Sequence, residues 1–249
     1  AFLAHTDAQV GRLRAALKDM DQYDNTLFVY IVGDNGASAE GGLTGSTNYM
    51  GDLQGLVSDV ARYADAPQTL IGENTYAHYN AGWAWGTNTP FQWTKQVASH
   101  LGGTRNPMVL AWPKRIRDRG GLRSQFGHVN DIVPTILEVT GIALPASVNG
   151  VAQQPLDGVS LAYSFDDAKA TERHTTQYFE IFGNRSIYHD GWMASAFRGR
   201  APWAVISGAR SEDFAADRWE LYDLRADFSQ GTDLAAREPA RLRELQQLF

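Results

Sequence analysis

"TLFVYIVGDNGASAEGG", residues 26–42, is the most informative segment of this sequence. Its first part, Thr26 to Val32, is a run of β-forming residues without polar alternation. Such a run is typical of a central strand of a parallel sheet that is covered on both faces. The run ends in Gly-Asp-Asn-Gly, and ligands of α/β proteins gather outside the carboxyl ends of parallel strands. Asp34 and Asn35 are therefore candidates for a binding site.

The same two residues allow a simpler interpretation. Asn-Gly is a strong signal for a tight hairpin turn, so Asp34 and Asn35 could do no more than reverse the chain. As ligands, a carboxylate and an amide carbonyl would suit Ca²⁺ or Mg²⁺. Calcium takes about six or more oxygen ligands, so the remaining donors would have to come from elsewhere. Spacing alone leaves both interpretations open.

The segments on either side of this strand predict an α/β region over residues 1–150. A second apolar run, Met108–Trp112, predicts another strand, and Asn130 or Asp131 can cap a helix that stops at Gly141. Before the first strand, apolar residues at helical spacing predict a helix; they are Leu3, Val10, Leu13, Leu17 and Met20.

The pattern changes towards the C-terminus. Residues 151–173 read as a linker, and residues 174–249 read as a small α+β subdomain. Its expected strands are QYFEIF, SIYHD, WMASAF and WELYDL, with Asp190-Gly191 as a hairpin turn between the second and third. A final helix is expected after Pro239.

Composition limits the function. A net charge of −6 argues against nucleic-acid binding, which favours a basic surplus. The chain has no cysteine, which excludes disulfides and a cysteine nucleophile within it. No apolar run approaches the roughly 20 residues of a transmembrane helix. We expect a bacterial protein, and the sequence leaves its localisation open between cytoplasm and periplasm or secretion.

Four segments together resemble a known family. They are DNTLFVYIVGDNGAS, PFQWTKQVASHLGGTRNPMVLAWPKRI, FGHVNDIVPTILEVTGI and WELYDLRADFSQGTDLAAREP. Their order and spacing are similar to those of type I sulfatases, the arylsulfatase-like members of the alkaline phosphatase superfamily. The resemblance runs from about residue 5 to the C-terminus and implies the C-terminal half of such an enzyme. It implies an alkaline-phosphatase-like mixed or parallel sheet flanked by helices.

The resemblance also implies roles for particular residues. Asp34 and Asn35 match the family's ligands for a divalent cation, usually Ca²⁺. Lys95 matches the lysine that contacts the sulfate ester, the alternative being a solvated surface lysine. His100 could face the pocket or be a buried, hydrogen-bonded histidine. His128 is interpreted as structural.

Three parts of the family pattern are missing: the nucleophile, the paired aspartates that complete the metal site, and the upstream Lys and His residues that assist the leaving group. The family's nucleophile is a formylglycine made from the Cys or Ser of a Cys/Ser-x-Pro-x-Arg segment, and no such segment occurs here. We expect it in an absent N-terminal half, which would be this chain's partner. The chain alone is then expected to be inactive.

Two further segments bear on the site. Residues 46–93 form an aromatic-rich insertion, which could select an aryl or sugar leaving group or could be an ordinary covering layer. Glu40-Gly41-Gly42 lacks the lysine of a phosphate-binding loop and reads as a flexible connection.

The sequence leaves three functions open. The first is hydrolysis of small-molecule sulfate esters, which the resemblance implies. The second is hydrolysis of phosphonates or phosphodiesters on the same scaffold. The third is a non-catalytic binding module that keeps the metal loop.

Overall fold

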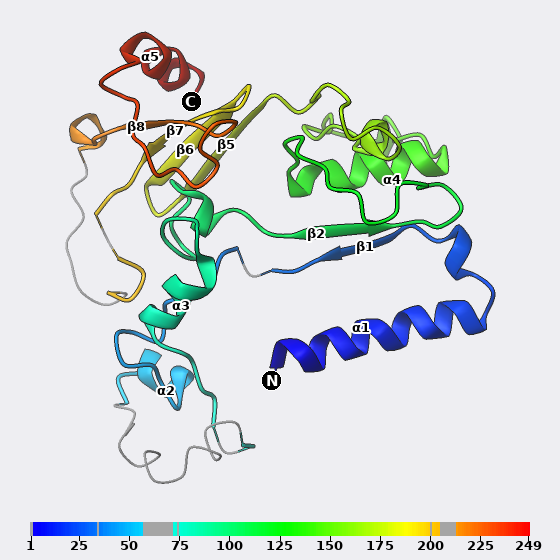
Figure 1. The fold of residues 1–249 in the computed structure, drawn as a ribbon, viewed down its shortest axis with the longest axis horizontal. Coiled ribbons are helices and arrows are strands. Elements are labelled where there is room, and N and C mark those ends of the chain that lie inside the picture. The colour runs from blue at the N-terminus through cyan, green and yellow to red at the C-terminus, as the bar shows by residue number, and fades with distance from the viewer. Residues whose placement is uncertain (1, 34, 57–71, 74, 200, 205–212) are drawn as a thin grey trace. The chain divides into compact units, whose positions relative to one another are not determined.

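The computed structural model describes residues 2–33, 35–56, 72–73, 75–199, 201–204 and 213–249 (Figure 1). The chain forms two compact units, and each combines segments that are distant in sequence. The first unit contains Ala1–Ile31 and Met108–Thr175, and the second contains Val32–Pro107 and Thr176–Phe249. The structure thus groups residues 32–107 with the C-terminal segment, whereas the sequence suggested a sequential division.

The first unit begins with the expected helix and strand. Helix α1 covers Phe2–Asp19, a 3₁₀ turn covers Tyr23–Asn25, and strand β1 covers Phe28–Ile31. Strand β2, Met108–Ala111, pairs with β1 in antiparallel register, Phe28 opposite Ala111.

The expectation of a parallel strand covered on both faces is wrong for β1 within the described residues. Its described partner β2 runs antiparallel, and the Ile31 side chain is 41% exposed. An apolar run specifies a strand, but it does not specify the direction of the neighbour that pairs with it. The Asn-Gly hairpin alternative is also wrong for the part of the chain that the structure describes, because there β1 pairs with β2 and not with the residues after Asn35.

Helix α4, Ile132–Thr140, begins and ends where the sequence predicted. The 3₁₀ turn Val129–Asp131 leads directly into it, and the carboxylate of Asp131, the last residue of the turn, accepts from the His128 N–H at 2.7 Å. Gly141 ends the helix in a left-handed conformation, φ 70°. His128 caps this turn, which agrees with a structural role.

Residues 151–173 are more ordered than the linker that the sequence predicted. They begin with the short strand β4, Val151–Ala152, which pairs with β3, Ser147–Val148, and they include the 3₁₀ turn Ala162–Ser164. The backbone N–H of Val159 donates to Asp131 at 2.7 Å, and that of Leu161 donates to the Thr135 hydroxyl at 2.8 Å. The segment therefore packs on α4.

The second unit contains the expected antiparallel sheet. Its strands are β5 Thr176–Ile181, β6 Asn184–His189, β7 Trp192–Ala196 and β8 Glu220–Asp223, in the order β5-β6-β7-β8. Asp190-Gly191 joins β6 to β7, and both residues have positive φ, 45° and 82°. This confirms the predicted turn, because a two-residue type I′ loop needs positive φ at both positions.

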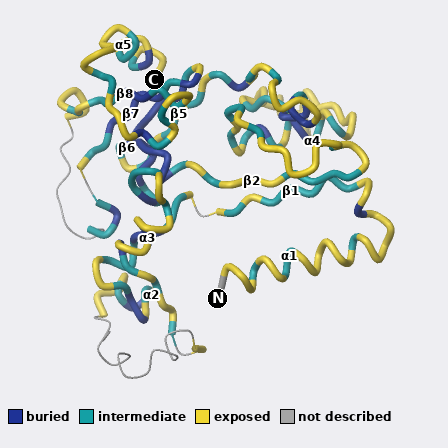
Figure 2. Tube along the Cα trace, viewed as in Figure 1, coloured by how far each residue is buried: buried dark blue, intermediate teal, exposed yellow. Residues whose placement is uncertain are grey.

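The best-packed core of the second unit lies between this sheet and helix α5, Pro239–Leu248 (Figure 1). Leu245 is fully buried against Ile187, Ala194 and Leu221. Figure 2 shows the buried residues concentrated along β6 and β7, and β6 is buried over its first five residues. The sheet gives the second unit a rigid base.

The described part of the 46–93 insertion belongs to the second unit. It contains helices α2, Tyr49–Leu53, and α3, Ala81–Asn88. Isolated β-bridges pair Ser46 with His78 and Asn48 with Tyr76, in the segments that precede the two helices. Two of its aromatic side chains, Tyr76 and Trp83, are more than 60% exposed. Another, Tyr63, lies outside the described residues. Across the described ranges, the structure has no helix long and apolar enough to cross a membrane.

Candidate active site

The segment that carries Lys95 has an unusual backbone. Trp93 and Gln96 have φ values of 67° and 76°, in the left-handed region that favours glycine. Thr94, between them, is fully buried. A non-glycine residue in this region costs of order 1–3 kcal/mol and persists only where its surroundings hold it. Such strain is concentrated at functional sites, so this segment is a candidate for part of one.

Asn88, at the end of α3, holds this segment in place. Its side-chain oxygen accepts from the Ala37 N–H at 2.9 Å. Its amide nitrogen donates to the carbonyls of Trp93 at 2.9 Å and Gly102 at 2.8 Å. One side chain thereby joins the loop after the Asp-Asn-Gly sequence to two parts of the Lys95 region.

The loop after Asn35 lies directly against Lys95. The backbone N–H of Lys95 donates to the Ala37 carbonyl at 3.1 Å. Gly36 has φ 75°, and a Cβ at this position would lie 1.8 Å from the Gly102 carbonyl oxygen and 2.9 Å from the Lys95 backbone nitrogen. Only glycine allows this approach. Asn35 is exposed beside it, whereas Asp34 lies outside the described residues.

A cluster of polar side chains surrounds Glu40. The Glu40 carboxylate accepts from the Tyr49 hydroxyl at 3.0 Å and from the Gln96 side-chain amide. The Lys95 ammonium nitrogen lies 3.9 Å from the same carboxylate. Glu40 lies in the loop that follows Asn35, and Tyr49 is the first residue of α2. Lys95 and Gln96 belong to the strained segment, residues 93–96.

The electrostatics of this cluster are consistent with an ionised carboxylate and a neutral phenol. Burial raises the pKa of Glu40, but hydrogen bonds from Gln96 and Tyr49 and the charge of Lys95 outweigh it, so the pKa lies below its usual value. Burial, together with the hydrogen bond to Glu40, raises the pKa of Tyr49 to about 12. At neutral pH, Tyr49 therefore donates and Glu40 carries a negative charge.

Glu40-Gly41-Gly42 is not the flexible connection that the sequence suggested. A Cβ on Gly41 would lie 2.4 Å from the Tyr79 carbonyl oxygen, and the Gly42 carbonyl accepts from the Ala81 N–H at 2.8 Å. Nearby, the His78 ring contacts the Ser38 hydroxyl at 2.9 Å. The segment is packed in place because long-range contacts, which a local pattern does not reveal, hold it.

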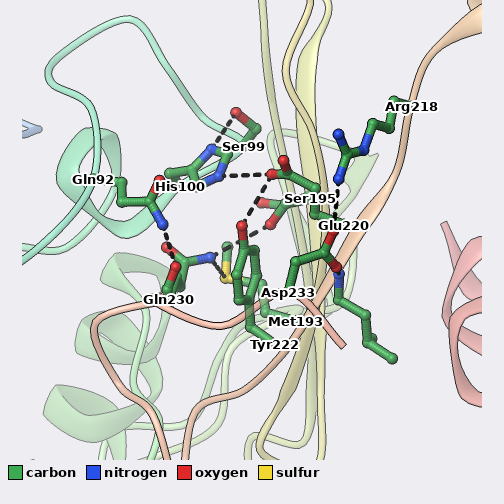
Figure 3. A network of polar contacts seen from close by, with 12 residues as sticks. Gln92, Ser99, His100, Met193, Ser195, Arg218, Glu220, Tyr222, Gln230 and Asp233 are labelled. Carbon is green, nitrogen blue, oxygen red and sulfur yellow. Dashed lines mark hydrogen bonds and ion pairs between the residues drawn. The ribbon is translucent and has the colours of Figure 1, made fainter. Parts of the chain in front are cut away.

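His100 occupies an interior position rather than a pocket (Figure 3). Its ring nitrogens contact the Ser99 hydroxyl at 2.9 Å and the Glu220 carboxylate at 3.1 Å, and the residue is 1% exposed. The hydrogen bond from His100 lowers the pKa of Glu220. His100 thus links the Lys95 region to β8, in the geometry of a structural histidine.

Gln230 makes a second link from the Lys95 region to the sheet (Figure 3). It is fully buried, and its side-chain oxygen accepts from the Leu101 N–H at 2.8 Å. The Gln92 side chain donates to its carbonyl, and its own amide lies 3.4 Å from the Ser195 hydroxyl. Through these bonds the sheet supports the loop that presents Lys95.

The glycines after His100 allow close packing. They lie in the 3₁₀ turn Leu101–Gly103, where a Cβ on Gly102 would lie 2.1 Å from the Gln92 carbonyl oxygen. The Arg105 guanidinium lies over the Phe91 ring, 5.0 Å from its centre, which suits a bracing role.

The described residues do not form a cation site by themselves. They contain no group of three or more His, Asp or Glu side chains that could hold a metal ion. Asn35 supplies one amide oxygen, and hard cations need several oxygen ligands.

Sequence reasoning missed Asn88, Glu40, Tyr49 and Gln230. Asn88 and Gln230 act across long separations: 51 residues between Asn88 and Ala37, and 129 between Gln230 and Leu101. Tyr49 bonds to Glu40 across nine residues, but Glu40 also bonds to Gln96, 56 residues away. Only Glu40 had a sequence feature that pointed to the site, because it lies a few residues after the Asp-Asn-Gly sequence.

Several sulfatases are similar to this chain. An uncharacterized sulfatase of Schizosaccharomyces pombe is 27% identical over 98% of this chain and 41% of its own length. The arylsulfatase of Klebsiella aerogenes is 29% identical over 65% of this chain and 33% of its own length. An N-acetylglucosamine-6-O-sulfatase of Bacteroides thetaiotaomicron is 25% identical over 49% of this chain and 20% of its own length. The chain therefore spans about two fifths or less of these relatives.

Solved structures share the fold. A Bacteroides thetaiotaomicron protein from work on the metabolism of multiple glycosaminoglycans matches 98% of this chain and 42% of its own, with TM-score 0.61 and 18% identity. Ps i-CgsB, crystallised with k-i-k-neocarrahexaose, matches 96% of this chain and 39% of its own, with TM-score 0.56 and 20% identity. These likenesses confirm the α/β fold class.

The Sulfatase family profile matches residues 1–142, more than half of the chain. That stretch includes the Asp-Asn-Gly loop, the strained segment with Lys95 and helix α4. The chain belongs to the sulfatase family.

Proposed function

We propose that this chain is part of an enzyme that hydrolyses small-molecule sulfate esters, in which the Lys95 ammonium contacts the sulfate group. The observation that carries the proposal is the bond from the Lys95 N–H to the Ala37 carbonyl. It brings Lys95 beside the Asp-Asn-Gly loop, although the two are far apart in sequence. Two strained residues, Trp93 and Gln96, bracket the lysine.

The proposed role of Lys95 is electrostatic. An ammonium is a compact charge with three rotatable donors, so it can follow a sulfuryl oxygen as the ester bond breaks. Donors aimed at developing charge in a site away from bulk water contribute strongly to catalysis. Lys95 is only partly exposed, with 28% of its side chain accessible, which fits such a site better than a solvated surface lysine does.

Most of the remaining parts of the reaction would come from outside the described residues. We propose a formylglycine nucleophile beyond residues 1–249, and a divalent cation, Ca²⁺ or Mg²⁺, held in part by Asp34 and Asn35. Such a cation would offset negative charge on the sulfuryl oxygens. Bacterial origin, and a location in the cytoplasm or outside it, are likewise proposals.

The named relatives favour a sulfate ester over the phosphate alternatives. The K. aerogenes relative is an arylsulfatase and the B. thetaiotaomicron relative acts on an N-acetylglucosamine sulfate, by their names. The exposed rings of Tyr76 and Trp83 would suit stacking on an aryl or sugar leaving group.

The substrate class is tested with matched substrates. We expect the full-length protein that contains this chain to cleave an aryl sulfate with a kcat/KM at least about tenfold above that for the matching aryl phosphodiester. The measurement is initial-rate release of the same phenol from both compounds. A preference for the phosphodiester would favour a phosphodiesterase, and turnover of neither compound would favour a binding module.

The metal ligands are tested by calcium titration. In the full-length protein we expect Asp34→Ala to weaken calcium binding more than Asn35→Ala does, because a charged ligand is lost. Isothermal calorimetry gives the affinities without depending on turnover. Asp157→Ala, which removes an exposed aspartate far along the chain, is the control. Equal affinities for Asp34→Ala and the control would remove Asp34 from the metal site.

A further inference from the structure

The surroundings of Glu40 assign it a part in presenting Lys95. We propose that Glu40 is a positioning residue, whose fixed carboxylate directs the Lys95 ammonium towards the sulfate group. The inference rests on the proposed function, because it takes Lys95 as the sulfate contact. It adds a residue that does not itself touch the substrate.

The distance between the two charges suits positioning rather than locking. The Lys95 ammonium nitrogen is 3.9 Å from a Glu40 carboxylate oxygen, which is longer than a hydrogen bond of about 2.7–3.2 Å. At this range the charges still attract each other. An ammonium has three N–H donors, so its contact with Glu40 does not prevent it from donating to an anionic group.

Glu40 itself is held firmly. Its side chain is 12% exposed, and Tyr49 and Gln96 donate to its two oxygens. A typical surface pair in this chain, Arg115 and Asp166, has both side chains more than 40% exposed. Exposed pairs contribute little because both side chains move in water. Glu40 is instead a fixed negative charge beside Lys95.

Glu40 also stabilises the strained backbone beside the lysine. Gln96, the residue after Lys95, has φ 76°, and its side chain donates to Glu40. Its carbonyl accepts from the Asn184 side chain at 3.2 Å. A strained residue needs such contacts to hold it. One carboxylate thus restrains both the Lys95 side chain and the backbone that presents it.

A double-mutant cycle on kcat/KM tests the proposal in the full-length protein. Glu40→Gln removes the charge and keeps an oxygen that can accept from Tyr49. We expect it to lower kcat/KM about tenfold when Lys95 is present. In the Lys95→Ala background we expect no further loss, because a residue that acts through Lys95 has nothing left to position. The Ki of inorganic sulfate should rise in parallel in Glu40→Gln.

Glu172→Gln is the matched control. Glu172 is also a partly buried glutamate whose carboxylate accepts a hydrogen bond, from the Phe126 N–H at 2.7 Å, but it belongs to the first unit. Any effect of Glu172→Gln should be the same with and without Lys95. If Glu40→Gln fails to fold, Tyr49→Phe removes one bond to Glu40 and should give a smaller loss that depends on Lys95.

The outcomes separate the inference from the function on which it rests. Equal losses from Glu40→Gln in both backgrounds would mean a general structural role and would overturn the inference. So would an unchanged kcat/KM in Glu40→Gln. Normal kinetics in Lys95→Ala itself would instead overturn the proposed sulfate contact.

Discussion

Lys95→Ala in the full-length protein is expected to lower kcat for a sulfate ester by roughly 100-fold or more, with little change in stability. Loss of a single donor to developing charge typically costs this much in other enzymes. The fold should tolerate the change because Glu40 keeps its bonds from Tyr49 and Gln96. The melting temperature and kcat, measured on the same preparation, separate the two effects.

Two variants sharpen this result. Lys169→Ala removes an exposed lysine of the first unit and should leave kcat unchanged. Lys95→Arg keeps the charge but replaces a compact ammonium by a planar guanidinium, so we expect partial activity. If Lys95→Ala has the kinetics of the Lys169 control, Lys95 belongs with the solvated surface lysines.

The sequence predicted the C-terminal sheet well because its signals are local. Asp190-Gly191 has the residues that a type I′ turn requires, and the strands on either side of it pair as the predicted hairpin, with His189 opposite Trp192. Helix α5 begins at Pro239, a residue that is favoured in the first turn of a helix.

The direction of strand pairing was not predictable in the same way. The apolar run before Asp34 indicated a strand, but its antiparallel partner β2 lies more than seventy residues further on, from Phe28 to Met108–Ala111. No local residue pattern encodes a pairing at that separation. Register and direction follow from burial and turns, and no turn joins these two strands.

The site was predictable only where a family motif covered it. Lys95 was a candidate from its motif, but Glu40 and Asn88, which hold its surroundings, were not. Their roles arise where the Asp-Asn-Gly loop meets the end of α3 and the strained segment. A glutamate before two glycines has no distinctive pattern until the fold brings Tyr49 and Gln96 to it.

Gly36→Ala is expected to be among the most damaging single substitutions in the chain. The added Cβ would lie 1.8 Å from the Gly102 carbonyl oxygen, an atom of the backbone that cannot rotate away. The Gly36 φ of 75° adds strain for any residue with a Cβ. We expect a loss of about 4 kcal/mol or more in the free energy of unfolding, or detachment of the loop.

Two other glycines divide this effect into its causes. Gly42 has φ 73° but open space around its Cβ position, so Gly42→Ala should cost only about 1–2 kcal/mol. Gly11 lies inside α1 with open space, so Gly11→Ala should stabilise the helix by about 0.5–1 kcal/mol. Denaturant unfolding of the three variants gives the comparison. A Gly36→Ala cost no larger than that of Gly42→Ala would show that the loop does not pack against Gly102. If the loop instead detaches and the fold survives, kcat should fall as it does in Lys95→Ala, because the Lys95 N–H bonds to Ala37 in that loop.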